Sequence, residues 1–473
     1  MSINLAKLSG NTIVIPGERL DALKARVRGT VLTKHDEGYG AARNVWNAMI
    51  DRRPAIIVRC AGAADVSAAV DFAREAGALL SVRGGGHNIA GSAVCDGGVM
   101  IDLSPMKSVR IDPFARTARV EPGVTLGEFD REAQAFGLVT PTGINSTTGI
   151  AGLTLGGGFG WTSRKFGLTA DNLIGADVVT ADGRLVHASN AENPDLFWAI
   201  RGGGGNFGIV TSFEFRLHAL GPEVMSGLIV YPLSQAADLL TRYREVMEAA
   251  PDELTCWPVM RTAPPLSFLP QEVHGTGIIA FAACYAGPMD VAEVAMRPLR
   301  EIGRPIADVI GPHPFVGWQA VLDPLLAPGA RNYWKSHSFS TLSDGVIDTL
   351  VEFAERFPSP ECELVCAQLG GAVNQISPEA TAYPHRDIGF VLNIHTRWRD
   401  SADDAACIAW ARSVFEACKP FATGGVYVNF MPEEEKDRVA NAYLGNAERL
   451  AAIKARYDPH NLFRINQNIR PTP

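Results

Sequence analysis

Glycine is concentrated in three clusters in the first half of this chain, and these clusters restrict the possible folds more than any other feature of the sequence. They lie within residues 84–86, 147–160 and 201–208, and the chain holds 47 glycines among its 473 residues, a share above the usual ~7%. Because glycine has no Cβ, its backbone N–H groups can come close to a flat or anionic molecule. The clusters therefore indicate where the chemistry of this protein is located.

The first cluster follows an expected β-α-β unit. Ala55–Arg59 and Leu79–Arg83 are apolar runs typical of strands, and Asp65–Ala76 between them has helical spacing. The second strand leads into Gly84-Gly85-Gly86-His87-Asn88, whose N–H groups can form an anion-binding nest suited to a diphosphate. His87 would lie beside the bound molecule, where a neutral ring nitrogen can act as a nucleophile or a ligand. Taken alone, a histidine in a glycine loop is more often an ordinary polar loop residue.

The third cluster contains a literal G-x-G-x-x-G at Gly203, Gly205 and Gly208. A dinucleotide-binding Rossmann motif needs a strand before these glycines and a helix after them. Here a helix-like segment (Asp195–Ile200) precedes and a strand-like segment (Ile209–Phe215) follows. The spacing therefore favours a tight turn that packs against something flat. A phosphate-binding Walker A loop is also absent from the sequence, because no cluster is followed by Lys-Ser/Thr.

Composition and charge exclude several classes of function. Hydrophobic residues make up 47% of the chain and charged residues 20%, which indicates a globular protein, and the net charge of -8 without a basic stripe argues against a nucleic-acid partner. No signal peptide or membrane-length apolar stretch is visible, so we expect a cytoplasmic protein with no membrane partner. Eight scattered cysteines without CxxC or Cys/His spacing indicate reduced thiols and no metal site.

After about residue 220 the sequence pattern changes. Amphipathic segments alternate with strand-like runs, which is typical of an α+β domain. The expected helices lie near Ser234–Ala250, Ser343–Phe357 and Ser401–Ala417, and the expected strands are Leu254–Met260, Thr276–Tyr285, Cys362–Leu369 and Phe390–Trp398.

Several ordered motifs resemble one family over nearly the whole chain. VRGGGHNIAG at residues 82–91, TTGIAGLTLGGGFG at 147–160 and DLFWAIRGGGGNFG at 195–208 are similar to the flavin-contacting segments of the berberine-bridge-enzyme-like branch of the vanillyl-alcohol-oxidase superfamily. YVNF at 427–430 and YDPHNLF at 457–463 resemble the closing elements of its flavin domain. The resemblance implies an α+β fold with a two-part PCMH-type FAD-binding domain at 1–218, a substrate domain of antiparallel sheet covered by helices at 219–424, and a C-terminal segment at 425–473 that returns to the first domain.

The resemblance implies FAD as the cofactor, covalently bound through the loop histidine, which is His87 here. A covalent bond would raise the flavin potential and prevent loss of the cofactor. Many relatives add a second bond from a cysteine, but Asn145 occupies that position, so we expect a single attachment. The other residues implied to bind FAD are Arg83, Gly84, Gly85, Gly86, Asn88, Gly91, Ser92, Thr147, Thr148, Gly149, Gly152, Gly157, Gly158, Gly208, Ile209, Val210, Tyr427 and Asn429.

The resemblance also implies an oxidase that removes a hydride from an alcohol, phenol-type or amine substrate and passes the electrons to O2, giving H2O2. Thr148 stands where family oxidases carry a small or Val-like residue and dehydrogenases a bulkier one, which favours the oxidase. Three alternatives stay open: a dehydrogenase with another electron acceptor, a non-catalytic flavoprotein, and a reductase with noncovalent flavin.

Substrate chemistry is expected on the strand at residues 390–398, which has one polar face because Val391, Asn393, His395 and Arg397 alternate with Leu392, Ile394 and Thr396. Asn393 aligns with a Gln or catalytic Glu of relatives, and His395 on the same face has a pKa suited to a base, although a polar sheet edge would explain it nearly as well. Tyr427 is a second candidate for a hydroxyl donor or base, and Phe430 replaces the second Tyr of a Y-x-N-Y pattern in sugar-oxidising relatives. The substrate is therefore expected to be a small molecule, aromatic or partly apolar. Gln368 is a further candidate contact, with a core role as the alternative.

Overall fold

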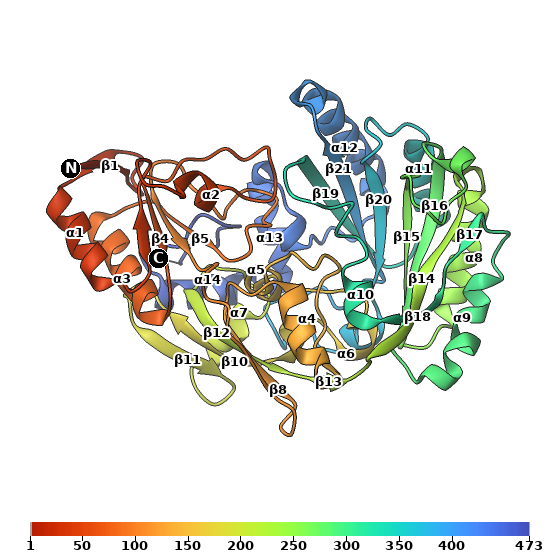
Figure 1. Ribbon diagram of the computed structural model, residues 1–473, viewed down its shortest axis with the longest axis horizontal. Helices are drawn as coiled ribbons and strands as arrows, with labels where there is room; N and C mark the ends of the chain where they lie inside the picture. Colours follow the sequence, from red (N-terminus) through yellow and green to blue (C-terminus); the bar gives the residue numbers. More distant parts are fainter. Residues whose placement is uncertain (1, 473) are drawn as a thin grey trace.

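The computed structural model describes residues 2–472, apart from the side chain of Lys436. The fold is α+β, as the sequence predicts, with two halves joined side by side (Figure 1). The half drawn in red to yellow holds a four-stranded and a five-stranded sheet, and the half drawn in green to blue holds one eight-stranded sheet. The blue helices α13 (Val439–Tyr443) and α14 (Ala447–Tyr457) return to the first half.

The four-stranded sheet contains the expected β-α-β unit. Its order is β3-β4-β6-β5, with β4, β6 and β5 parallel. The helix α3 connects β4 to β5 and ends at Gly77, whose φ of 59° lies in the left-handed region that favours glycine. The chain leaves the end of β5 directly into the first glycine cluster. The bounds are β3 Thr30–Leu32, β4 Ile56–Arg59, α3 Ala63–Ala76, β5 Leu80–Arg83 and β6 Val99–Asp102.

The five-stranded sheet has the order β11-β10-β12-β8-β7 and carries the second and third glycine clusters on its connections. Its helix α4 is capped by Thr125, whose N–H donates to Glu128 at 2.7 Å in a capping box. The bounds here are β7 Val109–Asp112, β8 Thr117–Val120, α4 Leu126–Gln134, α5 Ile150–Leu155, α6 Ser163–Phe166, β10 Leu173–Val179, β11 Leu185–Ser189, α7 Pro194–Ile200 and β12 Ile209–Arg216. Smaller elements complete this half: β1 Ile3–Ala6, β2 Thr12–Ile15, α1 Gly17–Arg26, α2 Tyr39–Arg43, β9 Leu138–Val139 and β13 His218–Ala219.

The eight-stranded sheet has the order β17-β14-β16-β15-β20-β21-β19, with β18 paired to β14. The sequence patterns predict β15, β16, β20 and β21 but miss β14 and β19. The strands are β14 Glu223–Pro232, β15 Leu254–Thr262, β16 Gly277–Tyr285, β17 Ala307–Asp308, β18 Gly311–Pro314, β19 Arg331–Phe339, β20 Glu363–Gln368 and β21 Phe390–Trp398. The helices are α8 Ala236–Glu248, α9 Ala292–Arg300, α10 Phe315–Gln319, α11 Asp344–Ala354 and α12 Asp404–Cys418.

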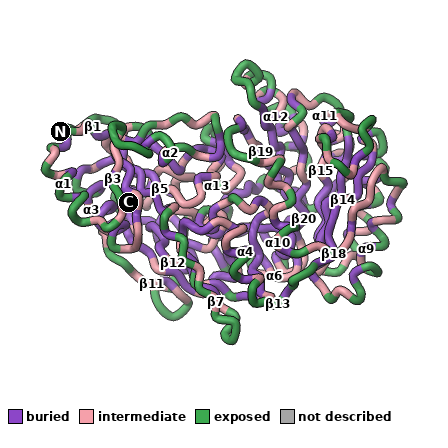
Figure 2. The backbone as a smooth tube through the Cα atoms, in the orientation of Figure 1, coloured by how far each residue is buried: buried purple, intermediate pink, exposed green. Residues whose placement is uncertain are grey.

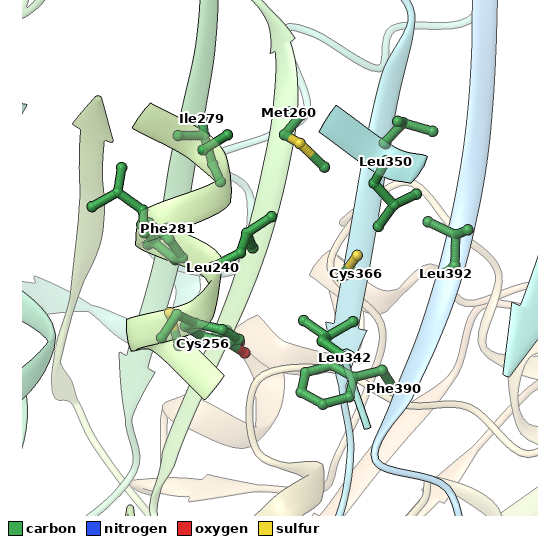
Figure 3. Close-up of a cluster of buried hydrophobic side chains, with 14 of the residues drawn as sticks. Leu240, Cys256, Met260, Ile279, Phe281, Leu342, Leu350, Cys366, Phe390 and Leu392 are labelled. Atoms are coloured by element: carbon green, nitrogen blue, oxygen red, sulfur yellow. The ribbon is translucent and has the colours of Figure 1, made fainter. Parts of the chain in front are cut away.

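One face of this sheet is covered by helices, and the other faces the first half. Figure 3 shows the covered face, where Met260, Phe281 and Leu392 of the sheet pack against Leu240 of α8 and Leu350 of α11. Because strand residues alternate between faces, the intervening side chains of β15, β16, β20 and β21 must point to the opposite side. Figure 2 shows that the interior between the two halves is buried as well.

The C-terminal segment packs against the first half of the molecule. Leu450 of α14 joins the core of the five-stranded sheet, and Phe463 joins the core beneath the four-stranded sheet. Between them the fully buried Lys454 ammonium contacts the Asp458 carboxylate at 2.6 Å, and that carboxylate accepts the N–H of Phe463 at 2.8 Å. All eight cysteines are buried and free. Within residues 2–472 no helix combines the length and apolar character needed to cross a membrane.

Candidate active site

A cavity of about 390 Å³ lies between the glycine loops of the first half and the uncovered face of the eight-stranded sheet. The glycine loops form one wall, and strands β14 to β16 and β19 to β21 supply the other. Most of the cavity lining is apolar, and the polar side chains of the sheet wall lie on β15, β20 and β21, namely Arg261, Glu363, Asn393 and His395. Ligand sites in enzymes have this composition.

The first and second glycine clusters meet backbone to backbone at the floor of the cavity. A Cβ on Gly85 would lie 2.4 Å from the amide nitrogen of Gly149, so no side chain fits there. In the described part of the chain, no N–H of residues 84–88 donates a hydrogen bond to a protein acceptor. These donors remain available at the cavity, as a nest for a diphosphate requires.

Most of the residues predicted to bind FAD line this cavity, and a few lie behind it. The lining includes Gly84, Gly85, Gly86, His87, Asn88, Ser92, Thr148, Gly149, Gly152, Gly208, Ile209, Val210, Tyr427 and Asn429. The structure places Arg83, Gly91, Thr147, Gly157 and Gly158 outside the lining; Arg83, for example, donates to the carbonyl of Ala42. Gly204 and Gly205 of the third cluster also line the cavity, a role that the sequence interpretation assigned only to Gly208 in that cluster.

His87 is held in one tautomer by its neighbours. The Oδ1 of Asn145 accepts from both the N–H and the hydroxyl of Thr147, at 3.0 and 2.7 Å. Because its hydroxyl proton is used there, Thr147 Oγ1 can only accept from His87 Nε2–H, which lies 3.1 Å away. Nδ1 is therefore the unprotonated nitrogen, and its lone pair can accept only from the hydroxyl of Thr148, whose Oγ1 lies 3.4 Å away. Burial lowers the pKa of His87 to about 4, so the ring is neutral at neutral pH.

These features fit FAD. The free N–H groups of the glycine loop can bind the diphosphate, and the neutral Nδ1 of His87 provides a nucleophile at the same cavity. Trp46 stacks on His87 with ring centroids 5.2 Å apart and limits the movement of the imidazole. Asn466 Oδ1, buried at the same cavity, has no hydrogen-bond partner in the described chain.

The opposite wall carries the predicted polar face of β21. Asn393 and His395 both line the cavity and are 8% and 3% exposed, so the alternative of a solvent-facing edge does not hold. His395 Nδ1 lies 2.9 Å from Glu363 of β20, whose other oxygen accepts from Arg261 of β15 at 2.7 Å. Burial raises the pKa of the Glu363 carboxyl, but the charge of Arg261 and the His395 contact outweigh it and hold the pKa at about 2.

Tyr427 reaches the cavity from the C-terminal segment. Its phenol oxygen accepts from the N–H of Gly158 at 3.2 Å and from Asn429 Nδ2 at 3.0 Å. The phenol proton is therefore free to be donated to a molecule in the cavity. Burial raises the pKa of Tyr427 to about 12, so the phenol is protonated in the physiological range.

Gln368 does not belong to this set. Strand alternation places its side chain on the helix-covered face of β20, where its Oε1 accepts from the N–H of Cys256 at 3.3 Å. Its placement agrees with the alternative core role. Sequence reasoning missed Trp46, Arg261, Trp334 and Glu363, which all contribute to the cavity. Strand periodicity was the signal that could have placed Arg261 and Glu363 on one face of the sheet. A polar residue at a strand end does not show, however, whether helices cover that face or a cavity lies against it.

Comparisons with known proteins agree with this geometry. The family model described as an FAD binding domain matches residues 54–189, and the model for berberine and berberine-like proteins matches residues 426–470. The (R)-6-hydroxynicotine oxidase of Paenarthrobacter nicotinovorans is 32% identical over 462 residues, covering 94% of this chain and 97% of the relative. The chitooligosaccharide oxidase of Gibberella zeae is 29% identical and covers 99% and 98% of the two chains. The crystal structure of 6-hydroxy-D-nicotine oxidase from Arthrobacter nicotinovorans has a TM-score of 0.85 at 30% identity, with 94% and 98% coverage.

The fold and the site together define an enzyme of the FAD-linked oxidoreductase class. More specifically, the chain belongs to the berberine-bridge-enzyme-like family, whose two domain models match residues 54–189 and 426–470.

Proposed function

We propose that this protein is an FAD-dependent oxidase that removes a hydride from an alcohol, phenol-type or amine substrate and gives H2O2. The observation that carries the proposal is the placement of His87, with its neutral and unprotonated Nδ1, across one cavity from the polar side chains of β21. FAD, when bound, accepts the hydride and delivers two electrons to dioxygen, which takes up two protons. The residues of this chain hold the reacting carbon and control the proton that leaves the adjacent O–H or N–H.

Single covalent attachment through His87 is part of this proposal. The Nδ1 lone pair supports His87 as the attachment point, and Asn145 holds the position from which relatives provide a cysteine. Thr148 supports reaction with oxygen, because its short side chain lies at the cavity beside His87 and leaves space there.

An aromatic or partly apolar substrate is favoured by the cavity lining. The walls near Tyr427 carry Phe159 and Phe430, whose ring centroids lie 4.8 and 4.9 Å from that of Tyr427. Phe430 has no hydroxyl for a sugar, so the site lacks one of the polar groups that a carbohydrate would use.

Acid precipitation of the purified protein tests the attachment. We expect yellow colour and flavin fluorescence to stay with the polypeptide of the parent and of the matched control His35→Ala, whose histidine is exposed and far along the chain from the loop. The variant His87→Ala is expected to release its flavin. Release from all three proteins would contradict covalent attachment and favour the reductase alternative.

A peroxide assay tests the oxidase. Purified protein is screened against alcohols, phenols and cyclic amines under air, and each substrate that reduces the flavin should release an equal amount of H2O2. Substrate-dependent flavin reduction that is reversed by a quinone or dye, but not by air, would instead identify a dehydrogenase. Absence of flavin reduction by any member of the panel would favour a non-catalytic flavoprotein.

A further inference from the structure

The connection between α2 and β4 joins the glycine loop of the first half to the strand β19 of the second half. The backbone N–H of Trp46 donates to the carbonyl of Gly86, two atoms 3.0 Å apart. The next residue, Asn47, binds both halves through its amide group. Its Nδ2 donates to the carbonyl of Ile89 at 3.3 Å and to that of Asn332 at 2.9 Å, and its Oδ1 accepts the N–H of Asn332 at 3.0 Å. This short connection therefore fixes the glycine loop relative to β19.

The side chain of Trp46 lies between His87 and the second half. Its indole stacks on the imidazole of His87, with ring centroids 5.2 Å apart and 20° between the planes. Its Nε1–H donates to the carbonyl of Leu326 at 2.8 Å, and the ring of Trp334 from β19 lies edge-on to it at 5.7 Å. Trp46 is 4% exposed, so the indole has little freedom to move.

Arg397 of β21 supports the same indole. Its guanidinium carbon lies 5.4 Å from the centre of the Trp46 ring, where a cation is attracted to the aromatic face. Its Nη2 donates to the carbonyl of Ala327 at 2.5 Å, next in the chain to the Leu326 carbonyl that binds Trp46. Its Nε contacts the Glu361 carboxylate at 2.8 Å. Arg397 lies outside the lining of the cavity, so its link to His87 runs through Trp46.

We propose that Trp46 and Arg397 are positioning residues for the attachment of the flavin to His87, and that attachment therefore depends on the docking of the second half against the glycine loop. The inference rests on the proposed function, since it concerns the covalent bond assigned there to His87. Thr147 selects the ring nitrogen that carries the proton, whereas the stacked indole of Trp46 sets the plane of the imidazole and so the direction of the Nδ1 lone pair.

The attachment reaction shows why this direction matters. One bond forms between Nδ1 of His87 and the methyl carbon of the flavin, and one C–H bond of that methyl group breaks. Two protons leave, one from the methyl group and one from Nε2, and two electrons pass to the flavin. Dioxygen then takes up two electrons and two protons as H2O2. Trp46 and Arg397 contribute alignment, because the reacting atoms must approach to about 3–3.5 Å along the lone pair.

The time course of attachment in flavin-free, full-length protein tests the role of Trp46. Noncovalent binding of FAD is measured from its fluorescence change, and attachment from the flavin fluorescence that stays with acid-precipitated polypeptide. At saturating FAD, Trp46→Leu is expected to attach flavin about tenfold more slowly than the parent. Trp46→Phe keeps an aromatic ring against His87 and should recover most of the rate.

A buried tryptophan outside the cavity serves as the control for loss of an indole. Trp318 of α10 is 3% exposed and packs against Trp161 with ring centroids 5.1 Å apart. Trp318→Leu should attach flavin at the parent rate. Because every rate is taken at saturating FAD, weaker FAD binding alone does not change it.

Arg397→Gln tests the dependence on the second half. It is expected to slow attachment several-fold at saturating FAD, and Arg397→Lys, which keeps a cation beside Trp46, should recover part of the rate. The matched control is Arg399→Gln, since Arg399 contacts the same Glu361 carboxylate at 2.7 Å but has a side chain 57% exposed. It should attach flavin at the parent rate.

Parent rates in both Trp46→Leu and Arg397→Gln would overturn the proposal, and so would equally slow attachment in Trp46→Phe and Trp46→Leu. A parent protein that loses its flavin in acid would contradict covalent attachment itself. A parent that attaches flavin but forms no H2O2 with any substrate would contradict only the oxidase function, because the attachment rates need no substrate.

Discussion

Thr147 Oγ1 lies 3.1 Å from Nε2 of His87 and, because its proton is donated to Asn145, it selects the histidine tautomer with an unprotonated Nδ1. Asn145 therefore has a structural role beyond standing where a cysteine would be needed for a second flavin bond. It orients the threonine that orients the proposed attachment residue.

Replacement of Thr147 by valine is expected to slow flavin attachment. Valine keeps the shape but removes the oxygen that accepts from Nε2–H, and loss of a hydrogen bond worth about 1 kcal/mol corresponds to roughly fivefold in rate. The measurement is the time course of flavin fluorescence in denaturing gels after FAD is added to flavin-free protein. Thr147→Ser should attach flavin at the parent rate, and equal rates for valine and parent would refute the role of the hydroxyl.

Replacement of Thr148 by leucine is expected to hinder oxygen. The larger side chain would fill cavity space beside His87, and a barrier higher by about 1.4 kcal/mol makes reoxidation roughly tenfold slower. The flavin is reduced by light without substrate and then mixed with oxygenated buffer, so the result does not depend on knowing the substrate. Unchanged reoxidation would remove Thr148 as an argument for the oxidase.

Replacement of Tyr427 by phenylalanine is expected to lower stability. The change leaves the N–H of Gly158 and one N–H of Asn429 without their acceptor in a buried place, at a cost of about 1–3 kcal/mol. Thermal unfolding measures this effect. Phe430→Leu, a neighbouring change without such partners, serves as the control for loss of aromatic packing; a Tyr427→Phe protein as stable as the parent would show that water satisfies both donors.

Asp130 makes stability depend on pH. Burial raises its pKa to about 7, although Gln319 Nε2 donates to it at 2.9 Å and partly offsets the effect. A raised carboxyl pKa means that the folded protein holds the proton more tightly than the unfolded chain. The stability from this group is present below the unfolded pKa near 4 and is lost as the pH rises from about 4 to 7.

Asp130→Asn removes this dependence, because its amide keeps an oxygen for Gln319 but carries no charge. We expect the variant to be more stable than the parent above pH 7, by an amount on the order of 2 kcal/mol, and the difference to shrink toward pH 4. Urea unfolding at several pH values measures it. The control Asp238→Asn changes a side chain that is 67% exposed on α8, and its stability relative to the parent should not change with pH. If the stabilities of Asp130→Asn and the parent change with pH in parallel, Asp130 is not the cause of the pH dependence.

Glu363 changes the stability with pH in the opposite direction to Asp130. Its pKa is held at about 2, so the stability that it contributes is present above the unfolded pKa near 4.5 and is lost as the pH falls toward 2. We expect the Glu363→Gln variant to be less stable than the parent at pH 7. Between pH 4.5 and 2, its stability should fall less steeply than that of the parent. Circular dichroism during acid titration checks this, and an equal slope for the two proteins would show that the Arg261 and His395 contacts do not hold the carboxylate in solution.

Features that depend only on residues close together in the chain follow from the sequence. The glycine loop after β5 is local, because a strand end followed by three residues without side chains leaves N–H groups free, and His87 lies within it. The alternation of Asn393 and His395 along β21 is also local, since the two-residue period of a strand is independent of its partners. The family motifs added the order of the domains and the cofactor.

The roles of the polar residues depend instead on how distant segments pack together. Gln368 is polar and close in sequence to Glu363, but the helices above the sheet cover its face, and no local pattern shows which face a sheet will bury. His395 is a candidate base in the sequence, but its ring nitrogens lie beside Glu363 and Asn332, which come from two other strands. One of these strands, β19, is half polar and so lacks the apolar pattern that predicts a strand. Protonation is set by the acceptors around a group, and those acceptors meet only when distant segments pack together.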